Sequence, residues 1–80
     1  MRITKGMQGP AIKQWQFFLK ARGYYRGDAS GHFDSPTSDG TSAFQRQNGL
    51  RQTGELDFLT YCRATVMGLP PLLNLIGEEK

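Results

Sequence analysis

The 80-residue sequence predicts an all-α fold, a small three-helix bundle with helices over about residues 10–22, 36–48 and 57–67. Each of these segments begins at a helix-starting residue and is followed by a glycine, the usual pattern at the two ends of a helix. Apolar residues recur at helical spacing, most clearly in the first and third segments. The chain is also short enough to be a single domain.

The cysteine and histidine counts exclude two common ways of stabilising a small fold. One cysteine cannot form an internal disulfide, and one cysteine with one histidine cannot complete a zinc site of four nitrogen and sulfur ligands. We therefore expect a hydrophobic core that suffices alone, without metal or cofactor. No apolar run approaches the roughly 20 residues of a membrane span. The N-terminus does not show the basic and then apolar residues of a secretory leader, so the sequence does not predict how the chain would reach a site outside the cell.

The first helix is expected to begin at Pro10, since proline loses no hydrogen bond at the first helical position. Its apolar stripe consists of Ala11, Ile12, Trp15, Phe18 and Leu19. Phe17 lies nearly opposite this stripe, between Lys13 and Lys20. It is either an exposed binding anchor or a side chain covered by the apolar tail over residues 69–76.

The second helix is expected to have Ser35 as its N-cap, and the third to open at Asp57. In the third helix four apolar side chains share one face: Phe58, Leu59, Cys62 and Val66. We expect that face to pack on the core, which makes Cys62 a buried and inert thiol. The full expected core is Ile3, Ile12, Trp15, Phe18, Leu19, Tyr25, Phe33, Phe44, Leu50, Leu56, Leu59, Cys62 and Val66. A residue pair of strand is expected near Leu56.

A long connection over residues 23–34 separates the first two helices, where 2–8 residues are usual, and such loops are often functional. It carries the alternating polar residues Asp28, Ser30, His32 and Asp34. A calcium loop would need glycine at the sixth position and glutamate at the twelfth, where Phe33 and Asp39 stand. A hydrolytic site would need a rigid pocket that a domain of this size hardly offers. We therefore expect a polar turn without catalytic residues.

Four segments, taken in their order along the chain, resemble the three-helix peptidoglycan-binding domain family. The members of this family are small modules attached to bacterial and phage cell-wall hydrolases. They are Gly6-x-x-Gly9-x-x-Ile12-x-x-Trp15-Gln16-x-x-Leu19, Gly23-Tyr24-Tyr25 with Asp28 and Gly31-x-Phe33, Thr37 with Gly40-Thr41-x-x-Phe44-Gln45 and Gly49-Leu50, and Gly54-x-Leu56-Asp57-x-x-Thr60. The chain departs from the family pattern at Asp34, often glycine, and at Gly40-Thr41, often Ala-Val. Residues Asp28 and Gly31 are also further apart than in the family. The match covers about residues 3–67.

The resemblance implies a domain over residues 1–68, followed by a tail or the start of a linker over 69–80, with a short C-terminal helix as an open addition. It implies a non-catalytic module that binds peptidoglycan and targets an attached or partner hydrolase to the wall. Its place of action would be the cell envelope, the periplasm or the outside of the cell. From the loop and the neighbouring helix ends, we expect the ligand contacts to be Tyr24, Tyr25, Arg26, Asp28, His32, Gln45 and Asn48. We also expect Gln16 and Gln45 to bond loop backbone.

Two other functions remain open at this point. Residues 1–27 include six basic residues and no acidic one, while residues 28–80 carry four basic and seven acidic residues. A basic first helix is compatible with a nucleic-acid-binding module, although the nearly uncharged second helix and the long loop before it are unlike a helix-turn-helix reader. A protein–protein docking domain is the other alternative, with the Phe17 face and the tail as its surface.

Overall fold

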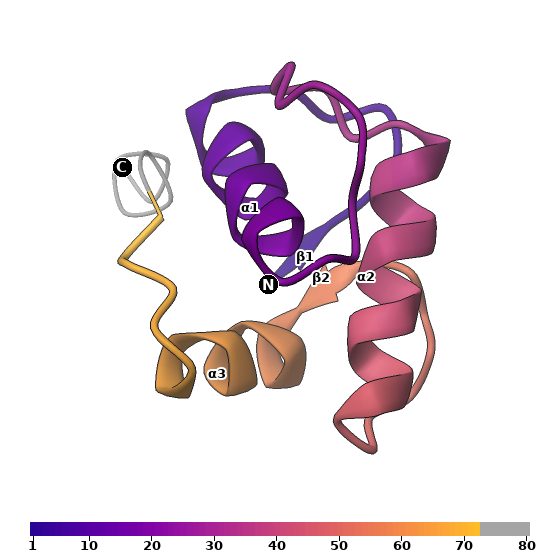
Figure 1. Cartoon of the computed structure of the whole chain (residues 1–80), viewed down its shortest axis with the longest axis vertical. Coiled ribbons are helices and arrows are strands. Elements are labelled where there is room, and N and C mark those ends of the chain that lie inside the picture. Colours follow the sequence, from indigo (N-terminus) through magenta and orange to yellow (C-terminus); the bar gives the residue numbers. More distant parts are fainter. Residues whose placement is uncertain (73–80) are drawn as a thin grey trace.

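The computed structural model describes residues 1–72 and consists of three helices and one two-stranded sheet (Figure 1). In chain order the elements are β1 (Arg2–Ile3), α1 (Pro10–Ala21), α2 (Ser35–Gln47), β2 (Leu56–Asp57) and α3 (Phe58–Val66). The predicted all-α class and the three helices are therefore confirmed, with ends that differ by about one residue. No helix within residues 1–72 has the length and apolarity needed to cross a membrane.

The α1–α2 interface is centred on Trp15, which is fully buried. Its indole N–H donates to the hydroxyl of Thr41 at 2.9 Å, so the polar atom of this large side chain has a partner inside the core. The ring stacks on Phe18 at 5.4 Å between centroids and meets Phe44 edge-on at 5.7 Å. Tyr24 adds a further edge contact to Phe44 at 5.8 Å. These rings hold the two helices together.

The two short strands tie the N-terminus to the segment before α3. β1 and β2 are antiparallel, with Arg2 opposite Asp57 and Ile3 opposite Leu56. The predicted residue pair of strand near Leu56 is thus confirmed, and both Ile3 and Leu56 belong to the core. An exposed ion pair between Arg2 and Glu55 lies beside this sheet at 2.9 Å.

The orientation of α3 differs from the prediction. Its buried residues are Thr60 and Ala64, while the four expected core side chains face outward. Phe58 is 60% exposed, Leu59 67% and Val66 79%, and Cys62 is an exposed free thiol. The expectation of an inert buried Cys62 was therefore wrong. The physical reason is that the small Thr60 and Ala64 allow close approach, and the hydroxyl of Thr60 accepts a bond from the buried amide of Gln45.

The N-cap of α2 is Asp34 rather than the predicted Ser35, which is the first helical residue. The carboxylate of Asp34 accepts from the Thr37 N–H at 2.9 Å, because its backbone is extended and aims the side chain at the open helix end. At α3, Asp57 caps as predicted and accepts from the Thr60 N–H at 2.9 Å.

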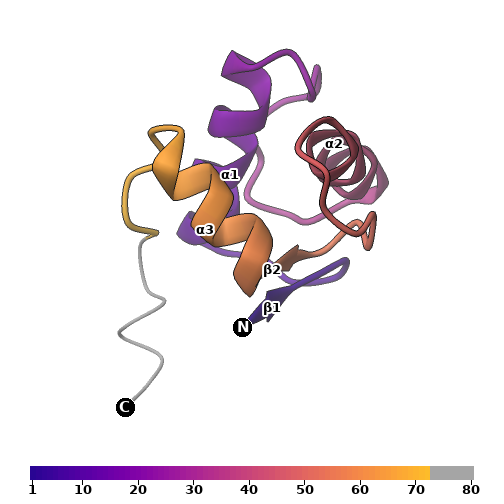
Figure 2. The ribbon, with the colours of Figure 1, turned by 90° about the horizontal axis from the view of Figure 1, so that it is seen from below.

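The described part of the tail packs back along α1. Leu69 and Leu72 are buried in the core, and the Gln14 side chain donates to the Pro71 carbonyl at 3.2 Å. Residues 69–72 are not helical, and the rest of the expected C-terminal helix lies outside the described residues. In the described part of the chain, which includes residues 69–72, the side chain of Phe17 is 55% exposed. Figure 2 shows this segment leaving α3 and passing on the side of α1 away from α2.

Candidate functional site

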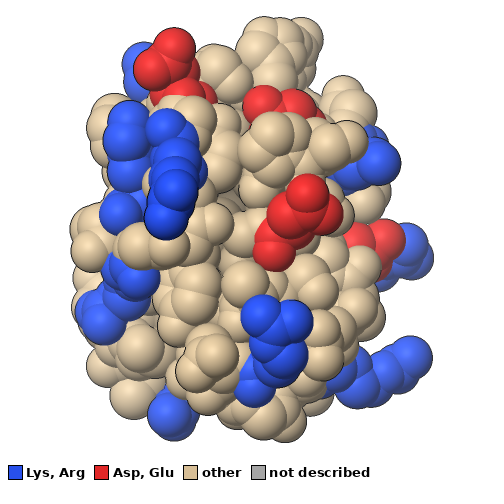
Figure 3. Space-filling view, turned by 45° about the vertical axis from the view of Figure 1, so that its right-hand side comes forward, with Lys and Arg blue, Asp and Glu red and all other residues tan. Residues whose placement is uncertain are grey.

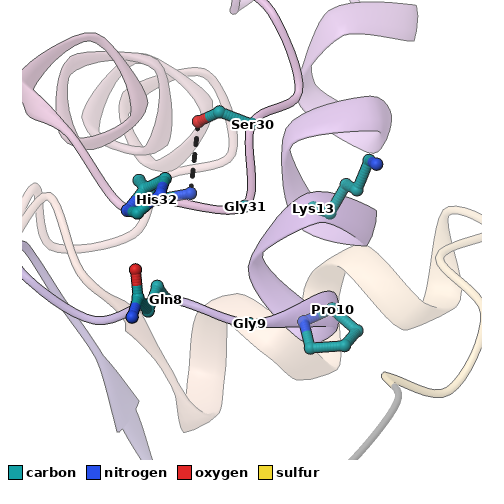
Figure 4. Close-up of a pocket in the computed structure, with 7 residues that line it drawn as sticks. All are labelled: Gln8, Gly9, Pro10, Lys13, Ser30, Gly31 and His32. Atoms are coloured by element: carbon teal, nitrogen blue, oxygen red, sulfur yellow. Dashed lines mark hydrogen bonds between the residues drawn. The ribbon is translucent and has the colours of Figure 1, made fainter.

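The long loop folds back onto the segment that precedes α1. Gln8 and His32 form an isolated antiparallel bridge, flanked by hydrogen bonds from Gly9 N to Gly31 O and from Phe33 N to the carbonyl of residue 7, both 2.9 Å. Two stretches separated by more than 20 residues thereby become neighbours. Figure 4 shows the two stretches side by side, with the side chains of Gln8 and His32 next to each other.

A buried glutamine of α1 holds the loop in this position. The Gln16 side chain is fully buried, and its Nε2 donates to His32 O at 2.8 Å and to Thr37 Oγ1 at 2.9 Å. Its Oε1 accepts from Gly31 N at 2.8 Å. The predicted role of Gln16 in bonding loop backbone is confirmed, and each of its bonds fixes part of the loop relative to the helices.

Close approach explains the glycine in the loop. Gly31 has a φ of +87°, in the region that favours glycine, and a Cβ there would lie 3.3 Å from the Gly9 carbonyl oxygen. A larger residue would push the loop away from the start of α1. The absence of a side chain at Gly31 therefore permits the narrow backbone contact between the stretches.

This contact shapes a shallow groove of about 670 Å³. Its lining consists of Gln8, Gly9, Pro10, Lys13, Ser30, Gly31 and His32. The polar side chains among them are exposed, and Ser30 Oγ accepts from the His32 N–H at 3.2 Å (Figure 4). The groove thus combines a hydrogen-bonded backbone floor with exposed side-chain donors and acceptors and one formal positive charge. Such a surface suits a polar or anionic ligand.

The predicted contact residues do not all lie together. Only His32 lines the groove, while Arg26 and Asp28 are exposed further back along the same loop. Tyr24 borders a second, smaller hollow with Ala21, Arg22 and Met67. The Arg22 guanidinium in that hollow donates to the Met67 carbonyl, so it serves to hold the end of α3.

Two of the predicted contact residues, Tyr25 and Asn48, form hydrogen bonds within the scaffold. Tyr25 is 4% exposed, and its hydroxyl donates to the Asp28 carbonyl at 2.7 Å. Asn48 donates to Phe44 O at the end of α2 and accepts from Arg63 Nε, both at 2.9 Å. These bonds shape the loop and the helix end. Tyr25 and Asn48 would therefore influence a ligand only by positioning other residues.

Gln45 repeats the arrangement of Gln16 at the second loop. It is fully buried, its Nε2 donates to Glu55 O at 3.0 Å, and its Oε1 accepts from Gly54 N at 2.9 Å. The prediction that Gln45 bonds loop backbone is confirmed. Every polar atom of its side chain is engaged inside the molecule, so we place it in the scaffold and outside the groove.

The sequence did not indicate Gln8, Lys13 or Ser30 as groove residues. The bridge that unites them joins positions far apart in the chain, and no local pattern marks it. The available signal was the pair of glycines, Gly9 and Gly31, one beside each half of the groove.

Hydrogen bonds at the starts of α2 and α3 lower the pKa values of the two aspartates that cap these helices. Burial would raise the pKa of the Asp34 carboxyl, but bonds from the Thr37 hydroxyl and N–H outweigh it and lower that pKa. The pKa of Asp57 is lowered in the same way, against its burial, by bonds from Thr60. These carboxylates are therefore caps.

Figure 3 shows basic side chains in a column along the left edge of the view, with acidic ones at its top and to its right.

Within the described part of the chain no three His, Cys, Asp or Glu side chains gather as metal ligands would. The described site is thus one of hydrogen-bonding groups and single charges. Recognition by such groups depends on position, which the buried Gln16 and the glycine contact provide.

A family model described as a putative peptidoglycan binding domain matches residues 8–62, which span the groove, α1, α2, β2 and the first half of α3. The chain belongs to this family. The resemblance noted from the sequence is therefore confirmed, and with it the assignment as a cell-wall binding module. Membership associates the chain with the cell wall.

Solved structures support this peptidoglycan-binding family assignment. The SleB N-terminal domain is 27% identical, with a TM-score of 0.80 over 84% of this chain and 92% of that one. A peptidoglycan-binding protein from Clostridioides difficile, solved with glutamine hydroxamate, is 30% identical with a TM-score of 0.74 over 80% of this chain. This chain spans 40% of the length of that protein. No curated protein matches the chain.

Proposed function

We propose that this chain binds peptidoglycan at the groove between residues 8–13 and 30–32, without chemical turnover, and thereby brings a hydrolase to the wall. The observation that carries the placement is the groove itself, a polar surface whose loop half is bonded to α1 by Gln16 and to the other half by the hydrogen bond from Gly9 N to Gly31 O. It lies within the segment that the family model matches.

Binding without catalysis agrees with the chemistry of the groove. A nucleophile needs an adjacent base held by a third group. Ser30 Oγ accepts a bond from the main-chain N–H of His32, and the imidazole ring of His32 forms no hydrogen bond with that hydroxyl. The groove is therefore suited to holding a ligand, and the hydrolytic step belongs to a partner.

Attachment to a hydrolase would act through local concentration. A wall-bound module joined to a catalytic domain makes the encounter of enzyme and substrate intramolecular, which raises avidity without new contacts at the catalytic site. The partner is either a domain on the same chain or a separate protein.

Co-sedimentation with purified sacculi tests the placement. The parent chain should sediment with sacculi, and the groove variant His32→Ala should bind roughly tenfold more weakly. Lys20→Ala, which removes an exposed charge at the far end of α1, is the matched control and should bind as the parent does. Circular dichroism and thermal unfolding confirm that each variant is folded.

Three outcomes would contradict the proposal in different parts. Failure of the folded parent to sediment at low salt would overturn peptidoglycan binding. Equal binding by His32→Ala and the parent would overturn the placement in the groove. Release of soluble muropeptides by the chain alone would overturn the non-catalytic role.

A further inference from the structure

The smaller hollow, at the C-terminal end of α1, has an aromatic lining residue that the groove lacks. Its volume is about 380 Å³, and its lining consists of Ala21, Arg22, Tyr24 and Met67. None of the residues that line the groove is Phe, Tyr or Trp. Small-molecule sites in proteins measure about 300–1,000 Å³, so the hollow has the size for one small group of a larger ligand.

Tyr24 is held by the core at its ring and is free at its hydroxyl. The half-buried ring meets Phe44 edge-on at 5.8 Å, and the main-chain N–H of Tyr24 donates to Leu19 O at 2.8 Å. The hydroxyl forms no hydrogen bond with residues 1–72. The side chain therefore offers an apolar ring and a hydrogen-bonding group at a fixed position, the combination that the carbon face and the hydroxyls of a sugar satisfy.

Arg22 brings unused hydrogen-bond donors to the same hollow. Its guanidinium lies over the Phe18 ring, 5.0 Å from the centroid, and donates to the Met67 carbonyl. It forms no ion pair with residues 1–72, and no Asp or Glu lines the hollow. A guanidinium carries five N–H donors, so donors remain for an oxygen of a ligand after the bond to Met67.

The other two lining residues distinguish one kind of sugar from another. Ala21 and Met67 are apolar, and they line the hollow together with Arg22. An acetamido group joins a carbonyl oxygen, which accepts from a guanidinium, to a methyl group, which gains by contact with apolar side chains. A hydroxyl in its place would leave the apolar part of the lining without a contact. The lining therefore favours an N-acetylated amino sugar over an unmodified hexose.

From these contacts we infer that the hollow is a subsite for one N-acetylated sugar residue of the glycan strand of peptidoglycan. The acetamido carbonyl accepts from Arg22, and the Tyr24 hydroxyl bonds a hydroxyl of the sugar ring. The inference rests on the proposed function and adds a second contact to it. α1 has 12 residues and is therefore about 18 Å long, so the hollow at one of its ends and the groove at the other hold different parts of the polymer.

Titration with two sugar oligomers tests the ligand. The full chain, isotopically labelled for NMR, is titrated with N-acetylated chitotetraose or with cellotetraose, which has a hydroxyl in place of each acetamido group. The first should shift the amide signals of residues 21–24 and of Met67, and the second should not at the same concentration. Equal shifts by both sugars, or no shift at the hollow with N-acetylated chitotetraose, would overturn the inference. Neither result affects the proposed function, which falls only if the folded parent fails to sediment with sacculi.

A pair of tyrosine variants tests the hydroxyl. Tyr24→Phe keeps the ring and should weaken binding of N-acetylated chitotetraose roughly three- to tenfold, the effect of one lost hydrogen bond. Tyr61→Phe is the matched control, because Tyr61 also packs against the core and does not line the hollow. It should bind the sugar as the parent does. Equal binding by the two variants would contradict the contact at Tyr24.

A second pair fills the hollow without disturbing the core. Ala21 and Lys20 are neighbouring exposed positions at the end of α1, and only Ala21 lines the hollow. Ala21→Met should reduce binding of N-acetylated chitotetraose at least tenfold, because the longer side chain occupies the place of the acetamido methyl group. Lys20→Met should leave binding unchanged. Parent-like binding by folded Ala21→Met would overturn the placement of the sugar in the hollow.

Discussion

The side-chain amide of Gln16 lies 2.9 Å from the hydroxyl of Thr37 and links the interior of α1 to the first turn of α2. The same amide nitrogen donates to the carbonyl of His32, and the amide oxygen accepts from Gly31. The Thr37 hydroxyl donates onward to the Asp34 carboxylate at 2.5 Å. One buried side chain therefore determines both the wall of the groove and the start of the next helix.

Replacing this side chain should damage stability and binding together. Gln16→Leu keeps the volume but leaves the Gly31 N–H and the His32 carbonyl without their partner, and an unsatisfied buried group costs about 1–3 kcal/mol. We expect the free energy of unfolding to fall by about 2–4 kcal/mol, measured by urea denaturation, and sacculus binding to be lost in the protein that remains folded.

Gln45→Leu is the matched control, since Gln45 is as buried and bonds the other loop. It should destabilise the fold by a similar amount, yet the folded fraction should bind sacculi normally because the groove is untouched. Loss of binding in both variants alike would show that Gln16 acts only through global stability.

The helices were predictable because their signals are local. Pro10 at the start of α1 and the Asp57 cap of α3 are visible in the sequence, and the structure has them at those places. The face of α3 was not predictable in this way. A helix of nine residues with apolar groups on several sides has no unique stripe, and the interior selected the small Thr60 and Ala64.

The groove was predictable only in part, for a related reason. The long loop was identified as functional, and His32 within it lines the groove. Gln8 and Lys13 join it through a bridge between distant segments, which no periodicity encodes. Polarity at Gln45 was visible in the sequence, but its burial depends on the loop that folds over it.

The outward face of α3 leads to a contrast between two leucines. Leu56 is fully buried, so Leu56→Ala should lower the free energy of unfolding by about 2–5 kcal/mol. Leu59 is 67% exposed, so Leu59→Ala should change it by no more than about 0.5 kcal/mol. Urea denaturation of both variants measures the difference. A large loss at Leu59 would mean that this face is covered in solution.

The thiol of Cys62 gives an independent readout of the same face. It is exposed and is the only cysteine of the chain, so Ellman's reagent should titrate one thiol in the native protein as completely as in urea. Protection of the native thiol would contradict the orientation of α3. Cys62→Ser, on an exposed site, should cost about 0.5 kcal/mol or less.

The two aspartate caps should make the fold sensitive to acid. Burial opposes ionisation of Asp34 and Asp57, but hydrogen bonds from Thr37 and Thr60 prevail and the folded-state pKa of each is lowered. A lowered pKa gives stability that is present above the unfolded pKa of about 3.9 and is lost as the pH falls through the folded value. The free energy of unfolding should therefore be flat from about pH 7 to pH 5 and decline below about pH 4.

The double variant Asp34→Asn/Asp57→Asn should flatten that acid decline, since asparagine still caps a helix but does not titrate. Glu55→Gln is the comparison: bonding to Arg2 lowers the pKa of Glu55, yet that pair is on the surface and should contribute little. Urea denaturation at several pH values measures all three. An acid decline that is unchanged in the double variant would assign the sensitivity to other carboxylates.

Gly40 in the middle of α2 tests the packing of the loop against the helices. Alanine normally stabilises a helix interior by about 1 kcal/mol relative to glycine. Here, however, a Cβ would lie 2.5 Å from the Tyr24 carbonyl oxygen and 3.4 Å from a methyl group of Leu19. Because the first contact is with backbone, the loop would have to move, and we expect Gly40→Ala to lower the free energy of unfolding by about 1–3 kcal/mol. Gln47→Ala, on an exposed turn of the same helix, is the control and should be neutral or slightly stabilising. A gain in stability at Gly40 would mean that the loop after α1 sits further from α2 than this structure places it.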